Sequence, residues 1–175
     1  MKRSFDSMAR ERTHARSLLW SAMLGLAAAC GADEARAIPT TPEPLDGQEC
    51  AACGMIVRDE PSPRAQVVHA DGTRAFFCSL ADLVAYQEVP SRHGALVHTW
   101  VETLPADLDP ALHDVGLRPW SPAADAHYVL GLERRVMGTP ALAYEREADA
   151  SAVATRVSGR AMRWNEAMRA LARHP

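Results

Sequence analysis

A short apolar segment near the start of the chain limits what the rest of it can fold into. Residues 18–29 (LLWSAMLGLAAA) follow residues 1–17, which carry five lysines and arginines. A basic stretch followed by about a dozen apolar residues is typical of a secretory signal peptide, and it is too short to cross a bilayer as a helix. We therefore expect residues 1–29 to be a signal peptide. The remainder has room for one domain or two very small ones.

The apolar segment ends at a cysteine. Residues 26–30 (LAAAC) resemble the lipobox of bacterial lipoproteins, although leucine is usual where Ala27 stands. In a lipobox the small residues admit a peptidase, and the cysteine becomes the lipid-bearing first residue. We predict lipidation of Cys30 and a periplasm-facing protein anchored to the outer membrane. The alternative is an ordinary secretory signal that leaves Cys30 as a free thiol.

The charge balance excludes one class of partner. The whole chain has 19 basic and 22 acidic residues, and residues 1–29 hold five and two of them, so 14 basic and 20 acidic residues remain, a net charge of −6. No block of basic residues could follow a phosphate backbone, so we expect no nucleic-acid partner.

The same order of predicted elements occurs twice after a flexible tether. Residues 30–48 are rich in proline, acidic and small residues without an apolar period, which predicts a tether. Two strands, a helix and a strand then follow in residues 49–104 and again in 123–175, joined by a proline-rich linker over 105–122. The predicted elements are 65–70, 73–78, 80–87 and 95–101 in the first unit, and 127–130, 141–144, 147–157 and 160–164 in the second, with a last helix over 165–173. The expected fold is α+β, with two small ββαβ units that must share an interface or bind metal to be stable.

The cysteines carry the strongest chemical signal. Cys50, Cys53 and Cys78 remain besides Cys30, and an odd number cannot form a fully paired disulfide framework. Cys50 and Cys53 form a CxxC pair, and Met55 adds a thioether two residues later. Thiolate and thioether donors select Cu(I) over hard cations, whereas zinc needs four nitrogen or thiolate donors.

Each further candidate ligand keeps a structural alternative. Met55 could instead fill the core. Cys78 ends a strand just before a helix, so it is a buried small residue or an additional thiolate, and His127 is a polar strand residue or a ligand. A thiol oxidoreductase needs its CxxC pair at the start of a helix, but strand-like residues follow Cys53. No catalytic triad, carboxylate pair or phosphate loop is evident, so we do not expect an enzyme.

These motifs, taken in order, resemble the NosL family of lipoprotein copper chaperones for nitrous oxide reductase maturation. The resemblance rests on CxxCGM, Asp71-Gly72, Phe77-Cys78-Ser79 and Met137-Gly138-Thr139-Pro140, and it covers the lipobox and most of residues 49–165. It implies two homologous ββαβ units and one bound Cu(I), which is passed towards nitrous oxide reductase with an ABC-type transporter and its periplasmic partner. It also makes Met137 the best candidate ligand outside the cysteine motif.

A second family pattern gives the main alternative. CxxCGM followed by Phe77-Cys78-Ser79 also resembles YHS or treble-clef modules, which implies that Cys50, Cys53 and Cys78 hold zinc in a structural or sensory role. That interpretation leaves Met137 and the second unit unexplained.

Overall fold

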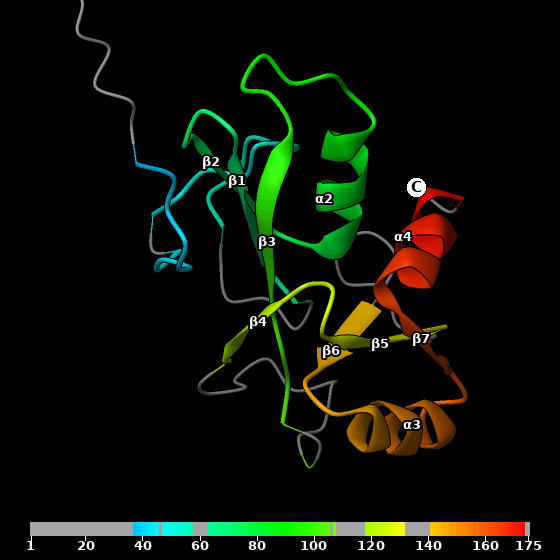
Figure 1. Cartoon of the computed structure of the whole chain (residues 1–175). Coiled ribbons are helices and arrows are strands. Elements are labelled where there is room, and N and C mark those ends of the chain that lie inside the picture. The colour runs from blue at the N-terminus through cyan, green and yellow to red at the C-terminus, as the bar shows by residue number, and fades with distance from the viewer. Residues whose placement is uncertain are drawn as a thin grey trace, which may run out of the picture. The chain divides into compact units, whose positions relative to one another are not determined.

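The chain folds as an α+β protein with two small antiparallel sheets and three helices in the part that the structure describes (Figure 1). The computed structural model describes residues 37–45, 47–57, 63–105, 107, 118–131 and 141–173, and these belong to one compact unit. The elements are β1 (Ala65–His69), β2 (Arg74–Phe77), α2 (Leu80–Gln87), β3 (Leu96–Glu102), β4 (Trp120–Pro122), β5 (His127–Leu130), β6 (Ala141–Tyr144), α3 (Glu147–Arg156), β7 (Arg160–Arg163) and α4 (Trp164–Ala172). Among them, no helix has the length and apolar character that crossing a bilayer requires.

The first sheet has the strand order β2-β1-β3-β4, with every neighbouring pair antiparallel. Its β1–β2 hairpin turns at Asp71-Gly72, and the Asp71 carboxylate accepts a hydrogen bond from the Thr73 amide at 2.9 Å. Helix α2 begins directly after β2. Ser79 is the N-cap of this helix, because its hydroxyl accepts a hydrogen bond from the Asp82 amide at 3.1 Å. The α2 helix packs on the β1–β2 side of this sheet.

Strand β4 lies inside the stretch for which the sequence predicts only a linker. Trp120–Pro122 pairs with the end of β3, where Trp100 lies opposite Pro122. Proline lacks an N–H group and is tolerated only on an edge strand, which is where β4 lies. Residues 120–122 therefore form a strand because β3 offers them hydrogen-bond partners, and not because their own sequence favours a strand.

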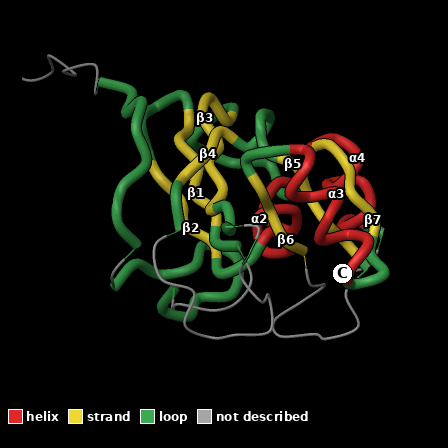
Figure 2. The backbone as a smooth tube through the Cα atoms, turned by 90° about the horizontal axis from the view of Figure 1, so that it is seen from below, coloured by secondary structure: helices red, strands yellow, loops and turns green. Residues whose placement is uncertain are grey.

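The second sheet repeats the arrangement, with the order β6-β5-β7 and α3 between β6 and β7 (Figure 2). The predicted strands at residues 127–130 and 141–144 are found with those bounds. After α3 the residue in the left-handed region is Ser158 (φ 55°). Glycine is required at the next position, 159, for lack of space, because a Cβ there would lie 2.6 Å from the carbonyl oxygen of Leu130.

The two halves share one core, which is one of the two arrangements expected for such small units. A single buried cluster contains Phe77 and Leu83 from the first half with Tyr128 and Leu171 from the second. Helices α2 and α4 also pack against each other. Burial of apolar surface between the halves supplies stability that about 50 residues cannot supply alone.

The end of the predicted tether is bound to the first sheet. Glu43 exchanges two hydrogen bonds with the buried Gln66 amide, at 3.0 and 2.9 Å, and Arg74 donates to the carbonyl of Thr41 at 2.6 Å. Leu45 is buried in the core. The side-chain amide of Gln66 bonds the backbone of Glu43 as a neighbouring strand would. The tether is therefore held to the sheet at Thr41 and Glu43, although its composition is that of a linker.

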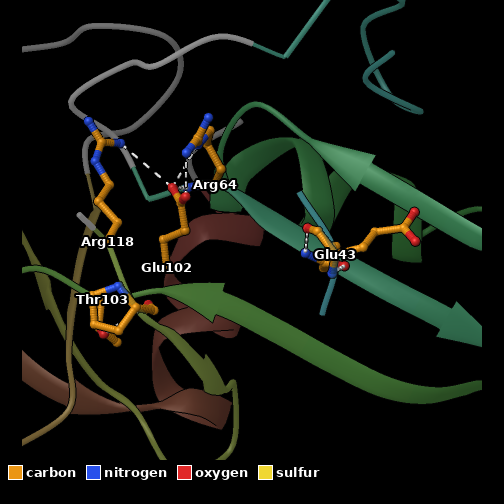
Figure 3. A network of polar contacts seen from close by, with 7 residues as sticks. Glu43, Arg64, Glu102, Thr103 and Arg118 are labelled. Atoms are coloured by element: carbon orange, nitrogen blue, oxygen red, sulfur yellow. Dashed lines mark hydrogen bonds and ion pairs between the residues drawn. The ribbon is translucent and has the colours of Figure 1, made fainter. Parts of the chain in front are cut away.

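A buried ion-pair network lies where β3 ends (Figure 3). Glu102 is only 2% exposed, and its carboxylate accepts a hydrogen bond from Arg64 Nε at 2.7 Å, while Arg118 Nη1 lies 3.6 Å away. A buried carboxylate is stable only when it is paired, and the two arginines supply that pairing. Because Arg64 precedes β1 and Arg118 precedes β4, the network joins the start of β1 to the segment that leads into the second half.

Candidate metal centre

The loop that contains the CxxC pair is closed on itself and bound to an edge strand. The Cys50 amide donates to the Met55 carbonyl at 2.7 Å, and the Gly54 amide donates to the Cys50 carbonyl at 2.9 Å. Gly54 has φ 73°, in the left-handed region that glycine adopts without strain, so it permits this tight return. The Ala51 amide donates to the carbonyl of Phe76 in β2 at 2.9 Å, which holds the loop at the edge of the first sheet.

This attachment brings the third cysteine to the other two. Cys78 follows β2 directly, two residues after the position where the loop is bound, and its sulfur lies 3.9 Å from that of Cys53. The sulfurs of Cys50, Cys53 and Cys78 and a carboxylate oxygen of Asp82 all lie within 4.8 Å of one another. Within the described ranges, no other group of histidine, cysteine and acidic residues is arranged in this way. All three cysteines are free thiols.

Asp82 is a member of the cluster that the sequence analysis did not identify as a candidate ligand. It lies in the first turn of α2, and its Oδ2 accepts a hydrogen bond from the Ser79 hydroxyl at 3.0 Å. The signal in the sequence is the spacing of four residues from Cys78 to Asp82 across a helix N-cap. A residue in the first turn projects near the end of the strand that precedes the helix.

The environment keeps two of the thiols protonated. Burial raises the pKa of the Cys78 thiol, and the neighbouring Cys50 raises it further. Partial burial of the Cys53 sulfur also raises the pKa of that thiol, although a hydrogen bond from the Met55 amide lowers it. Cys53 as a whole residue remains exposed. A reactive thiol of an oxidoreductase requires the opposite shift. A thiophilic metal ion, by contrast, displaces the protons and binds the thiolates.

The other predicted ligands are distributed differently. Met55 is 47% exposed, so it does not fill the core, and its thioether is available on the same loop as Cys53. His127 lies in β5, where its Nε2 is 2.8 Å from Arg163 Nη1, and it does not belong to the thiol cluster. Met137, the motif around it and Cys30 lie outside the described residues.

Exposed apolar side chains lie beside the thiol loop. A hollow of about 410 Å³ separates the loop residues Ala51 and Ala52 from the end of α2 and the turn that follows, including Tyr86 and Val89. Val89 is 66% exposed and Ile56 is 49% exposed. The surface beside the thiol loop is thus partly apolar.

The fold and this cluster together define a small α+β protein with an open thiol-rich site suited to a thiophilic metal ion. The model of the NosL family matches residues 42–172, and the chain belongs to this family, as its motifs predict. It is 30% identical over 155 residues to the copper-binding lipoprotein NosL of Stutzerimonas stutzeri, covering 81% of this chain and 74% of that protein.

The fold agrees with a solved structure. The crystal structure of the copper chaperone NosL from Shewanella denitrificans is similar with a TM-score of 0.60 and 22% identity, covering 73% of this chain and 96% of that one. This similarity confirms the predicted α+β fold class. Both relatives are named for copper and neither for an enzymatic activity.

Proposed function

We propose that the protein is a Cu(I) carrier. The observation that carries this proposal is the convergence of three free thiols within 4.8 Å, one of them on an exposed loop beside a methionine. We assign Cys50, Cys53, Met55 and Met137 as the principal candidate ligands, with Cys78 as an additional one, and two or three of them bind the ion at one time. Such soft donors favour Cu(I). The names of the two relatives, a copper-binding lipoprotein and a copper chaperone, support copper as the cargo.

The exposure of the site suits transfer. Cys53 is exposed, whereas Cys50 and Cys78 are buried, so one side of a bound ion would face the solvent. Cu(I) needs only two or three ligands, which leaves a position where a donor group of the acceptor protein can attack. The ion then moves by exchange of one ligand at a time. No chemical bond in a substrate is made or broken, which fits a carrier and not an enzyme.

We infer the destination of the copper from the resemblance to the family. We propose that the carrier is anchored through lipidated Cys30 to the outer membrane and faces the periplasm. There it delivers Cu(I) for the copper sites of nitrous oxide reductase, together with an ABC-type transporter and its periplasmic partner. The family match, the lipobox and the lipoprotein name of the Stutzerimonas stutzeri relative support this placement.

A competition titration tests the choice of metal. We expect the full-length, reduced protein to bind one Cu(I) and to hold it much more tightly than Zn(II), measured against chromophoric chelators specific for each ion. Stoichiometric zinc binding with weak copper binding would instead support a structural or sensory zinc module.

A complementation experiment tests the destination. In a denitrifying bacterium that lacks its own NosL gene, we expect this chain to restore copper content and activity of nitrous oxide reductase. A Cys30→Ala variant separates anchoring from binding, because it should retain Cu(I) affinity in vitro and lose membrane attachment. A chain that binds Cu(I) in vitro but does not restore the reductase in the cells would reject the destination but not the carrier function.

A further inference from the structure

The thiol loop, residues 50–56, exposes a run of residues that carries no charge. Residues 51–56 (AACGMI) are all exposed to solvent. Met55 is 47% exposed and Ile56 is 49% exposed. Apolar side chains that gather on the surface of a soluble protein mark a place where another molecule binds. Copper carriage explains the thiol and the thioether of this run, but it does not explain Ile56 or the two alanines.

A hollow beside this loop extends the apolar surface. Its volume is about 410 Å³. Its apolar lining comes from the thiol loop, from the exposed face of α2 and from the residues after that helix, and consists of Ala51, Ala52, Ala85, Val89 and Pro90. Val89 is 66% exposed, more than any other large apolar residue among those that the structure describes. A segment of another protein seated in this hollow would therefore touch the thiol loop.

The polar side chains of the hollow are held by hydrogen bonds. His69 Nδ1 donates to the carbonyl of Gly94 at 3.0 Å, and in the neutral imidazole its Nε2 accepts from the Tyr86 hydroxyl at 2.8 Å. His93 Nδ1 lies 2.8 Å from Asp71 Oδ2. These bonds join two lining residues, Tyr86 and His93, to the buried His69 and to the turn of the first hairpin. A surface that is already ordered loses less entropy when a partner binds.

The charge at the hollow is basic. Arg92 and His93 line it, and its lining contains no acidic residue in the part of the chain that the structure describes. Arg92 is exposed, and one of its five N–H donors, Nε, lies 3.2 Å from His93 Nε2. The chain after residue 29 has 14 basic and 20 acidic residues, a net charge of −6, so the hollow differs in sign from the rest of the chain. A guanidinium beside an apolar hollow is suited to a carboxylate, which it binds with two parallel hydrogen bonds.

We propose that this hollow is the docking surface for the protein that takes Cu(I) from the chain, and that it receives an acidic segment with apolar side chains. Those side chains pack against Val89 and the thiol loop, and a carboxylate of the partner pairs with Arg92. A second copy of this chain fits less well, because a symmetric dimer brings the same patch of both copies together and supplies no carboxylate for Arg92. The inference rests on the proposed carrier function and adds to it the surface and the chemistry of the acceptor.

The charge and the apolar contact should affect different rate constants. An exposed charge attracts the partner before contact, so Arg92 should govern the association rate and its dependence on salt. Apolar burial is gained only in the complex, so Val89 should govern the dissociation rate. This separation distinguishes a docking surface from a general loss of stability.

The test measures binding of the full-length protein, purified in detergent, to two immobilised probes. The probes are metal-free nitrous oxide reductase and the periplasmic partner of the ABC-type transporter from the same bacterium. We expect wild type to bind at least one probe, with an association rate that falls about tenfold between about 50 mM and about 300 mM salt. Arg92→Glu should slow association about tenfold or more at low salt and remove the salt dependence. Val89→Ser should speed dissociation about fivefold or more with little change in association.

A matched variant controls for net charge. Arg160 is exposed, lies in β7 and does not line the hollow, so Arg160→Glu changes the net charge equally and should leave both rates unchanged. Neither Arg92→Glu nor Val89→Ser removes a proposed ligand, so both should keep wild-type Cu(I) affinity against a chromophoric chelator. If Arg92→Glu lowers the melting temperature, Arg92→Gln decides, because it removes the charge, keeps an N–H donor and should still weaken the salt dependence.

Four results would overturn the inference: no binding to either probe, unchanged rates in the variants at positions 92 and 89, equal slowing by Arg160→Glu, and a wild-type dimer that Val89→Ser abolishes. The last result would assign the hollow to a second copy of this chain. The proposed function fails separately. Docking of the metal-free protein that depends on Arg92, without tight Cu(I) binding, would reject the copper carrier and retain the docking surface for another partner. Tight Cu(I) binding with docking that is independent of Arg92 and Val89 would do the opposite.

Discussion

The number of protons released by copper should reveal which thiols bind it. Cys53 and Cys78 both have raised thiol pKa values, so both are protonated near neutral pH in the metal-free protein. Each one that binds Cu(I) as a thiolate must release its proton, and each such proton makes the affinity rise about tenfold per pH unit. Together the two thiols should therefore increase Cu(I) affinity about a hundredfold per pH unit, or about 10,000-fold between pH 6 and pH 8.

Substitution of single residues then separates the ligands. Cys78→Ser should reduce the pH dependence by about one factor of ten per pH unit, and Cys53→Ser should do the same. We expect Cys53→Ser to cause the larger loss of affinity at a fixed pH, because only Cys53 adjoins a second soft donor, Met55. Met55→Ala is the matched control, because a thioether has no proton to lose, so affinity should fall while the pH dependence stays unchanged.

The assay is a competition titration with a chromophoric Cu(I) chelator at several pH values, corrected for protonation of the chelator itself. If Cys78→Ser retains the full pH dependence, Cys78 is not a copper ligand and its position near Cys53 serves another purpose. If neither cysteine variant alters the pH dependence, neither Cys53 nor Cys78 binds copper as a thiolate.

Further predictions concern the second half and the first hairpin. Met137→Ala should reduce both Cu(I) affinity and the rise in melting temperature on copper binding. Met162 lies on the buried face of β7, so Met162→Ala should lower apoprotein stability by roughly 2–5 kcal/mol without changing Cu(I) affinity. An unaltered Cu(I) affinity in the Met137→Ala variant would remove Met137 from the ligand set. The Asp71 carboxyl has its pKa lowered from 3.8 to about 2, first by the Thr73 amide and then by His93. Its contribution to stability is therefore present above about pH 4 and lost as the pH falls towards 2. Asp71→Asn should lower the melting temperature near neutral pH, with a difference from wild type that shrinks below about pH 4 and vanishes only below about pH 2. A pH-independent difference would contradict this reasoning.

Most of the secondary structure was predictable because its signals are local. The Asp71-Gly72 turn, the Ser79 cap and the apolar spacing that follows it lie within a few residues of the elements they specify, and β1, β2 and α2 occur within one residue of the predicted bounds. The soft-donor chemistry of Cys50, Cys53 and Met55 was likewise contained in six consecutive residues. Local backbone preferences and donor types can be read without knowing how distant segments pack.

The full metal centre depended on contacts that no local pattern contains. Cys78 joins the CxxC pair because the Ala51 amide binds the edge of β2 at Phe76, 25 residues further along the chain, and Asp82 joins because α2 begins where β2 ends. Strand β4 and the bound end of the tether arise in the same way, since β3 and Gln66 supply hydrogen-bond partners that their own sequences do not announce. Which donors meet around one ion is decided by strand pairing and packing, because these bring together residues whose separation along the chain carries no information about distance.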